Sequence, residues 1–360
     1  MNTTGDILNS GDFSRLEQWA AEKLGATRVE IARAERLSGG AVQENWRIDA
    51  LIEGGSHAGA QRWVLRTDAE ASLVVSLDRT AEYGAVCAAH AAGVRVATPI
   101  ARCEDQGIIG AQFVLQAYVQ GEGQARRLTR DSGVADWGPV VARELGRELG
   151  KIHLIRAGQT ELSFLPQPLL TPAKSEVARL RGALDQAAEA RPALEYVLSW
   201  LHDNDPGSEN LTLVHGDYRT GNYLVAEGHL AAVLDWEFAH WGDPHEDIGW
   251  FTAKCWRFGK TDLVAGGIAD LSSFLDGYRA TARTSPDESQ WPYWQDRAAA
   301  PRATLAVPQR DRERIGRGDT VAVIAANVPA LLEAHYAVPM IGAVLNPINI
   351  RLDAATIAFT

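Results

Sequence analysis

The chain has 360 residues, of which 46% are hydrophobic and 22% charged, and this ordinary composition excludes a disordered or fibrous protein. Its formal net charge of −11 argues against a nucleic-acid-binding surface, which needs a basic face. No segment approaches the ~18 consecutive apolar residues that a bilayer span requires. The three cysteines are widely spaced and fit neither a disulfide framework nor a zinc site. We therefore expect a cytoplasmic protein that binds neither nucleic acid nor membranes.

The first 119 residues predict a short N-terminal helix or extension over residues 1–24 and a small antiparallel lobe over residues 25–119. Glycine-rich turns separate short runs in which apolar and polar residues alternate, a pattern typical of strands. One helical pattern interrupts these runs and ends at Gly93, because glycine commonly terminates helices. The predicted elements are strands at Val29–Leu37, Asn45–Ile52, Arg62–Thr67, Thr98–Arg102 and Gln112–Val119 and a helix at Leu73–Ala92.

Residues 120–300 predict a second, mostly helical lobe, because apolar residues recur with a period near 3.6 from Val134 onward. A strand-like block within this lobe spans Leu211–Asp235. Together the two lobes predict an α+β chain. The predicted helices lie at about Val134–Ile155, Lys174–Ala190, Pro192–His202, Glu246–Phe258 and Ile268–Arg283.

Residues 203–247 are unusually acidic, with ten Asp and Glu residues and a single base, Arg219. Such an excess is usually a solvated surface. Carboxylates around a loop can also hold a metal or another cation. The pattern leaves both alternatives open.

The most informative segment is residues 215–222, with the sequence HGDYRTGN, which stands between two apolar runs. A further apolar run, Ala231–Leu234, follows a glycine turn and leads into Asp235. Hairpin strands bring residues near their ends together. Asp217, Asn222 and Asp235 are therefore expected to converge at one end of a small sheet.

These three residues form the set that phosphoryl transfer from ATP requires. One carboxylate orients the acceptor hydroxyl and takes its proton, while an Asn oxygen and a second carboxylate hold Mg²⁺ against the phosphates. The Asp-x₄-Asn spacing is that of the kinase catalytic loop, and Asp235 takes the place of the metal-binding Asp of the kinase Asp-Phe-Gly motif. The alternative is a polar hairpin with scattered surface acids, which the order of the motifs disfavours.

In these motifs the chain resembles the aminoglycoside phosphotransferase family, kinase-like enzymes that use His-Gly-Asp where protein kinases use His-Arg-Asp. It is most similar to the branch that resembles the phosphotransferase domains attached to some acyl-CoA dehydrogenases. The resemblance implies a bilobal, protein-kinase-like fold with Asp217 as catalytic base and Asn222 and Asp235 as magnesium ligands. It also implies that His215 braces the catalytic loop and that Asp247 stabilises it.

The residues expected to bind the nucleotide are predicted from their position ahead of the catalytic loop in the sequence. Gly39 and Gly40 stand between two strands, where small residues let backbone amides approach phosphates. The third strand offers Arg66 in place of the usual lysine, and Glu82 on the following helix is its natural partner. The alternative is that these two residues form an exposed ion pair of little value.

The last strand of the small lobe is expected to run into the hinge between the lobes. By analogy with kinase-like hinges, the backbone at Ala117 and Val119 binds adenine. The cofactors that the resemblance implies are ATP and Mg²⁺, and the resemblance covers about residues 25–290.

Residues 301–360 do not follow this pattern. A strand within Ile315–Asn327, a helix at Val328–Ala337 and a strand at Ile341–Pro347 predict a βαβ unit. The unit resembles the early part of acyl-CoA synthetases over about Gly316–Phe359. The fragment either packs on the second lobe or is a poorly anchored appendage, and the second alternative is favoured because a lone βαβ unit cannot cover both faces of its sheet.

The sequence therefore predicts an enzyme that moves the γ-phosphate of ATP to a hydroxyl of a small molecule. The acyl-CoA dehydrogenase-like branch points to a hydroxy acid or a hydroxyacyl-CoA as acceptor, rather than an antibiotic. The alternative is a non-catalytic, nucleotide- or ligand-binding relic of the kinase-like fold. Acyl-CoA ligase activity is not expected, because the chain stops before the phosphate loop of those enzymes.

Overall fold

The computed structural model of the chain describes residues 4–37, 43–68, 76–158, 162–185, 192–208, 210–282, 285–298, 320–324 and 344–348. The chain divides into two compact units, one made of Met1–Val177 and Trp200–Ala299 and the other of Ala178–Ser199 and Ala300–Thr360. The first unit contains the strand-rich lobe and most of the helical lobe. Every described helix is too short or too polar to cross a membrane.

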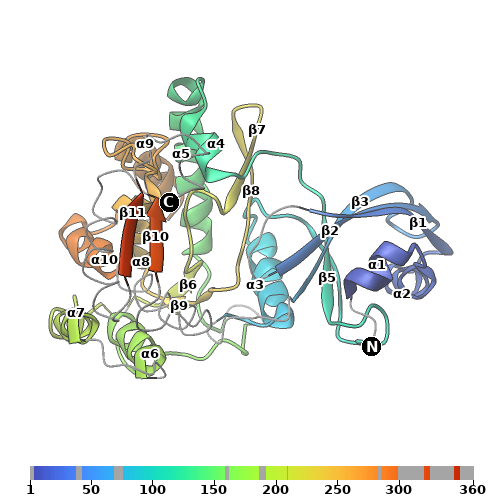
Figure 1. The fold of residues 1–360 in the computed structure, drawn as a ribbon, viewed down its shortest axis with the longest axis horizontal. Helices are drawn as coiled ribbons and strands as arrows, with labels where there is room; N and C mark the ends of the chain where they lie inside the picture. The colour runs from blue at the N-terminus through green and yellow to red at the C-terminus, as the bar shows by residue number, and fades with distance from the viewer. Residues whose placement is uncertain are drawn as a thin grey trace. The chain divides into compact units, whose positions relative to one another are not determined.

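The strand-rich lobe is a five-stranded antiparallel sheet in the order β1-β2-β3-β5-β4, so the predicted small antiparallel lobe is confirmed. Figure 1 labels β1, β2, β3 and β5 of this sheet. Its helix α3 begins at Arg79, because Asp78 caps the helix by accepting a hydrogen bond from the Ala81 N–H (2.8 Å). Residues 73–75 of the predicted helix lie outside the described residues. The elements are α1 (Thr4–Ser10), α2 (Ser14–Leu24), β1 (Arg28–Arg36), β2 (Gln43–Glu53), β3 (Gly59–Asp68), α3 (Arg79–Ala91), β4 (Pro99–Cys103) and β5 (Phe113–Ala117).

Strand alternation gives this sheet two different faces. On one face, Trp63 and Leu65 of β3 are almost fully buried in a core that α2 completes. Trp19 of α2 lies against Phe113 there, with ring centroids 4.8 Å apart. Arg66 follows Leu65 in the same strand and therefore lies on the opposite face, where it reaches α3. Because of this alternation, Leu65 lies in the core while its neighbour Arg66 faces α3.

The helical lobe contains two small antiparallel strand pairs, β6–β9 and the hairpin β7–β8. The three-residue strand β9 escaped prediction because a segment that short shows no alternation. The strands are β6 (Thr212–Val214), β7 (Tyr223–Ala226), β8 (His229–Val233) and β9 (His240–Gly242). The helices are α4 (Ala125–Arg130), α5 (Val134–Ile152), α6 (Pro172–Asp185), α7 (Pro192–Asp203), α8 (Pro244–Thr252), α9 (Leu271–Ala282) and α10 (Trp291–Arg297), with 3₁₀ turns at η1 (Lys254–Trp256) and η2 (Glu288–Gln290).

The helix predicted at Glu246–Phe258 is wrong in its second half, because α8 ends at Thr252. The guanidinium of Arg257 folds back on this end and donates to the Thr252 carbonyl from Nε (3.1 Å) and Nη2 (2.7 Å). A carbonyl left open at a helix end needs such a donor. The chain then makes only the short turn η1.

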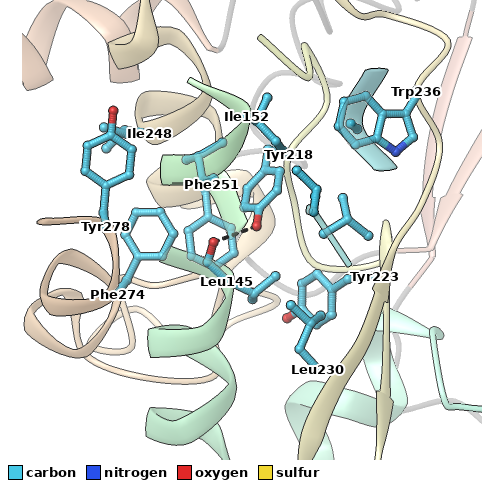
Figure 2. Close-up of a cluster of buried hydrophobic side chains, with 14 of the residues drawn as sticks. Leu145, Ile152, Tyr218, Tyr223, Leu230, Trp236, Ile248, Phe251, Phe274 and Tyr278 are labelled. Carbon is cyan, nitrogen blue, oxygen red and sulfur yellow. Dashed lines mark hydrogen bonds between the residues drawn. The ribbon is translucent and has the colours of Figure 1, made fainter. Parts of the chain in front are cut away.

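Helices α5 and α9 approach closely because glycines line their contact. A Cβ on Gly146 would lie 2.0 Å from the carbonyl oxygen of Phe274, and a Cβ on Gly277 would lie 1.9 Å from that of Arg143. The two helices form the centre of the core, with Phe274 packed beside Phe251 (Figure 2).

Gly146→Ala is therefore expected to lower the free energy of unfolding by about 1–3 kcal/mol or more, since the added methyl must displace a backbone carbonyl. Urea denaturation followed by circular dichroism measures this change. Gly182→Ala is the matched control: Gly182 lies within α6 with nothing within 4 Å of its Cβ position, so the variant should be neutral or slightly stabilised. Equal losses in the two variants would contradict the close packing of α5 on α9.

In the second unit, β10 (Thr320–Ile324) and β11 (Val344–Ile348) pair in parallel, with Thr320 opposite Val344. The two strands of the predicted βαβ unit and their parallel pairing are therefore confirmed. The predicted helix at Val328–Ala337 lies outside the described residues. Parallel pairing fits the continuously apolar sequence of residues 321–324.

Candidate active site

The segment HGDYRTGN connects β6 to β7, and the backbone requires its first glycine. Gly216 has φ +79°, and a Cβ there would lie 2.3 Å from the carbonyl oxygen of Phe238. Only glycine fits a left-handed position this crowded. Tyr218 anchors the loop in the core, where its hydroxyl donates to the Leu145 carbonyl of α5 at 2.7 Å (Figure 2). The loop is therefore held rigidly from both sides.

Asp247, near the start of α8, ties down the same loop. Its carboxylate accepts hydrogen bonds from the backbone N–H groups of His215 (2.7 Å) and Gly216 (2.9 Å), and His153 lies 3.2 Å away. Burial alone would raise the pKa of Asp247, but the hydrogen bond and charge of His153, with the N–H of His215, hold it below the usual value. This geometry is that of a loop support, the role that the resemblance implied.

His215 links the loop to the strand that ends at Leu234. Its Nε2 lies 2.9 Å from the Leu234 carbonyl oxygen, and the Asp217 N–H donates to its Nδ1 at 3.3 Å. A carbonyl can only accept and an N–H can only donate, so His215 is the neutral tautomer with its proton on Nε2. It is a brace in this position and has no free nitrogen for acid or base chemistry.

Asp217 is buried and surrounded by donors. Trp250 of α8 donates from its indole N–H to Oδ1 (2.7 Å), Asn222 donates to Oδ2 (2.6 Å), and Arg219 Nε lies 2.9 and 3.0 Å from the two oxygens. Burial raises the pKa of Asp217, and the charge of Arg219 and the hydrogen bond from Trp250 oppose this rise. Neither Arg219 nor Trp250 was among the predicted site residues.

Arg66 joins the small lobe to the second predicted metal ligand. Its Nη1 lies 2.8 Å from Glu82 Oε1, and its Nη2 lies 3.5 Å from Asp235 Oδ1. Only 11% of the Arg66 side chain and 3% of the Glu82 side chain are exposed, so the pair is not a surface ion pair of little value. Asp235 itself adopts a left-handed backbone with φ +67°, which a short polar residue tolerates best.

Two further charged residues extend this contact. Arg79 of α3 is buried and its Nη1 contacts the second oxygen of Glu82, while its Nη2 lies 4.0 Å from Glu237. The Glu237 carbonyl also accepts a hydrogen bond from the Leu77 N–H (2.7 Å). Arg79 precedes Glu82 by one helical turn, a spacing that could have indicated the pair. No feature of the sequence indicated the contact of Arg79 with Glu237.

The predicted hinge residues Ala117 and Val119 lie at and just after the end of β5. The Ala117 N–H donates to the Thr98 carbonyl (2.9 Å). The role of these two residues stays a prediction. Gly39 and Gly40, the predicted phosphate-covering residues, lie outside the described residues.

The residues around Asp217 fit the magnesium ion that the resemblance implies. Both side-chain hydrogen bonds of Asn222 use Nδ2, toward the carbonyl (3.0 Å) and Oδ2 (2.6 Å) of Asp217, so Oδ1 is the atom that can face a cation. Burial raises the pKa of Asp217 most, and the nearby charge of Asp235 adds to the rise. Hard oxygen ligands with an excess of negative charge suit Mg²⁺. The contacting charges comprise four carboxylates and three arginines: Asp217, Asp235, Glu82, Glu237, Arg66, Arg79 and Arg219.

A second cluster of titratable side chains, Glu176, His240 and Glu246, is an ion-pair network. Arg297 of α10 inserts its Nη2 between the two glutamates, at 2.6 Å from Glu176 and 2.7 Å from Glu246. Burial opposes a charge on His240, but Glu246 and Glu176 raise its pKa from 6.5 to about 9. His240 Nδ1 donates to the Phe238 carbonyl (2.8 Å), and Nε2 faces Glu246 (3.3 Å). The charges of Arg297 and of protonated His240 thus already balance those of the Glu176 and Glu246 carboxylates.

Comparisons with known proteins bear on the family to which the chain belongs. The model of the phosphotransferase enzyme family matches residues 33–330. Acyl-CoA dehydrogenase family member 11 of Gallus gallus is 28% identical over 227 residues, which are 60% of this chain and 28% of that protein. A stretch of 45 residues, 12% of this chain, is 76% identical to 8% of acetate–CoA ligase CCL3 of Humulus lupulus. Both predicted resemblances are therefore confirmed, and the chain spans well under a third of either relative.

Solved structures show the same fold. A putative aminoglycoside phosphotransferase from Ralstonia eutropha JMP134 superimposes with a TM-score of 0.67 at 22% identity, covering 92% of this chain and 96% of that chain. A thermostable mutant of aminoglycoside phosphotransferase APH(4)-Ia, solved with ADP and hygromycin B, superimposes with a TM-score of 0.51 at 15% identity, covering 83% and 94%. The predicted bilobal, kinase-like α+β fold is confirmed. With its family model matched over most of its length, the chain belongs to the phosphotransferase enzyme family.

Proposed function

We propose that the protein is an ATP- and Mg²⁺-dependent phosphotransferase that moves the γ-phosphoryl group to a hydroxyl of a small molecule. One observation carries the proposal. Arg66 of the small lobe lies at once on Glu82 of α3 and within 3.5 Å of Asp235, in the same unit as Asp217 and Asn222. A cation on the nucleotide side thereby lies near the carboxylate that is proposed to bind Mg²⁺. The Leu234 N–H, next to Asp235 in the chain, donates to the Asn222 carbonyl (2.8 Å) and so joins this carboxylate to the catalytic loop.

In this proposal Asp217 orients the acceptor hydroxyl and takes its proton. Asn222 Oδ1 and the Asp235 carboxylate hold Mg²⁺, which when bound neutralises charge on the phosphates. Arg66, fixed by Glu82, binds phosphate oxygens with its guanidinium fork. His215 and Asp247 keep the loop in place, so the base does not have to be reorganised during the reaction.

The acidic segment, residues 203–247, does not support a polycationic acceptor. Most of its carboxylates contact partners inside the described chain, so they are not a free acidic surface. Because these carboxylates are paired internally, they argue against a surface patch that binds cations in general. The pairs include Asp205 with Thr171, Asp217 with Arg219, Glu237 with Arg79, Asp243 with His245, Glu246 with Arg297 and Asp247 with His153.

The surroundings of Asp217 instead favour an acceptor with a negative charge. Any hydroxyl that reaches Asp217 comes close to the Arg219 guanidinium, which lies 2.9 Å from the carboxylate and 4.4 Å from the Trp256 ring centroid. Residues 253–260, which include Trp256, carry three basic residues and no acid. A hydroxy acid or its CoA ester suits this environment. The likeness to an acyl-CoA dehydrogenase family member supports the same class.

The test is ADP release from Mg·ATP with a panel of hydroxyl compounds that contains hydroxy acids, hydroxyacyl-CoA esters and aminoglycosides. Hydroxy acids or their CoA esters are expected to stimulate release, and mass spectrometry should find them phosphorylated. Faster turnover of aminoglycosides would contradict the anionic acceptor. A thermal shift with Mg·ATP but no turnover of any compound would support the alternative, a nucleotide-binding relic without catalysis.

A further inference from the structure

Asp217 is fully engaged in hydrogen bonds, which conflicts with its use as a base. An ionised carboxylate offers about four acceptor positions. Three donors take them up: Trp250 Nε1 on Oδ1, Asn222 Nδ2 on Oδ2, and the single Nε–H of Arg219, which the two oxygens share. An incoming hydroxyl needs one of these positions to give up its proton, so one donor must leave.

Arg219 is the donor that can leave most easily. Trp250 is only 7% exposed and is fixed within α8. Asn222 is held by its second bond to the Asp217 carbonyl (3.0 Å) and by its own carbonyl, which accepts from the Leu234 N–H (2.8 Å). Arg219 has 24% of its side chain exposed. Apart from Asp217, its guanidinium has a long contact to the Thr220 carbonyl (3.5 Å) and the face of Trp256 (4.4 Å).

We propose that Arg219 is a gate on the catalytic base: it occupies both oxygens of Asp217 until an acceptor arrives, and so denies the base to water. The inference rests on the proposed phosphotransferase function. When the gate opens, the acceptor oxygen forms a bond to the γ-phosphorus, the bond from that phosphorus to the β,γ-bridging oxygen breaks, and the hydroxyl proton passes to Asp217. With water as acceptor the same exchange would hydrolyse ATP to ADP and phosphate. While Arg219 stays on Asp217, this hydrolysis of ATP is suppressed.

The readout is ATP hydrolysis without any acceptor, measured as ADP release from Mg·ATP. Arg219→Met removes the Nε donor and its charge, and is expected to raise this hydrolysis by about tenfold, a part of the 10²–10⁴-fold acceleration that a general base contributes. Trp256→Leu removes the aromatic face on which the guanidinium rests and should raise the hydrolysis less. The double variant Arg219→Met/Asp217→Asn should return to the wild-type level, because the freed base is then absent.

Arg143→Met is the matched control, since Arg143 is an exposed arginine of α5 whose closest charged contact is 3.9 Å away. It should leave acceptor-independent hydrolysis unchanged. Nucleotide binding is followed separately by thermal shift with Mg·ATP. If Arg219→Met binds the nucleotide and hydrolyses it no faster than the wild type, the gate is wrong while the phosphotransferase proposal stands. If the wild type itself does not bind Mg·ATP, both are overturned.

Discussion

Asp217→Asn is expected to lower kcat for phosphoryl transfer by about 10²–10⁴-fold, because an amide cannot take the hydroxyl proton. The KM for ATP should change little, since Arg66 and the proposed magnesium ligands Asn222 and Asp235 remain. Initial rates of ADP release at saturating acceptor measure the effect. The substitution is nearly isosteric, so the variant should remain folded.

The control for this variant is Asp203→Asn, which neutralises an acid of the same segment whose side chain is 76% exposed and contacts only His202 among its described ion-pair partners. It should keep the wild-type rate. A wild-type rate in Asp217→Asn would remove Asp217 from catalysis and overturn its assignment as the base.

Asp247→Ala is expected to be the most destabilising single substitution at the site, at about 3–5 kcal/mol. It would leave the N–H groups of His215 and Gly216 without their acceptor and would strip His153 of its buried partner. Urea denaturation measures the loss. Asp276→Ala, at an acid with 57% of its side chain exposed, is the control and should change stability by only a few tenths of a kcal/mol.

The pH dependence of stability, compared between the wild type and Asp247→Asn, gives an independent check on the buried Asp247 carboxylate. The pKa of Asp247 in the folded protein lies below the ordinary value of 3.8. Its ionised form therefore stabilises the fold at pH values above about 4, and this contribution is lost as the pH falls further, toward the folded pKa. The stability difference between wild type and Asp247→Asn should accordingly be largest near neutral pH and shrink on acidification. A difference that does not depend on pH would contradict the ionised, buried state of Asp247.

Local sequence determined the catalytic loop itself. Asp217 and Asn222 are five residues apart in one turn, so any fold that keeps this loop between two strands brings them together, as the 2.6 Å hydrogen bond shows. Strand alternation likewise determined that Arg66 leaves the face on which Leu65 is buried. The extent of α8 was not predictable in this way, because a guanidinium from Arg257 ends it where the apolar pattern continues.

Only the tertiary structure decided which groups surround the loop. Trp250 and Asp217 are 33 residues apart, Arg66 and Asp235 are much further apart, and Glu237 meets Arg79 across the boundary between strand-rich and helical parts. Such contacts depend on how whole elements pack, and packing leaves no periodic mark in the sequence near either partner. The local sequence thus specified which residues are proposed to react. The packing of distant elements specified which charged groups and hydrogen-bond donors surround those residues.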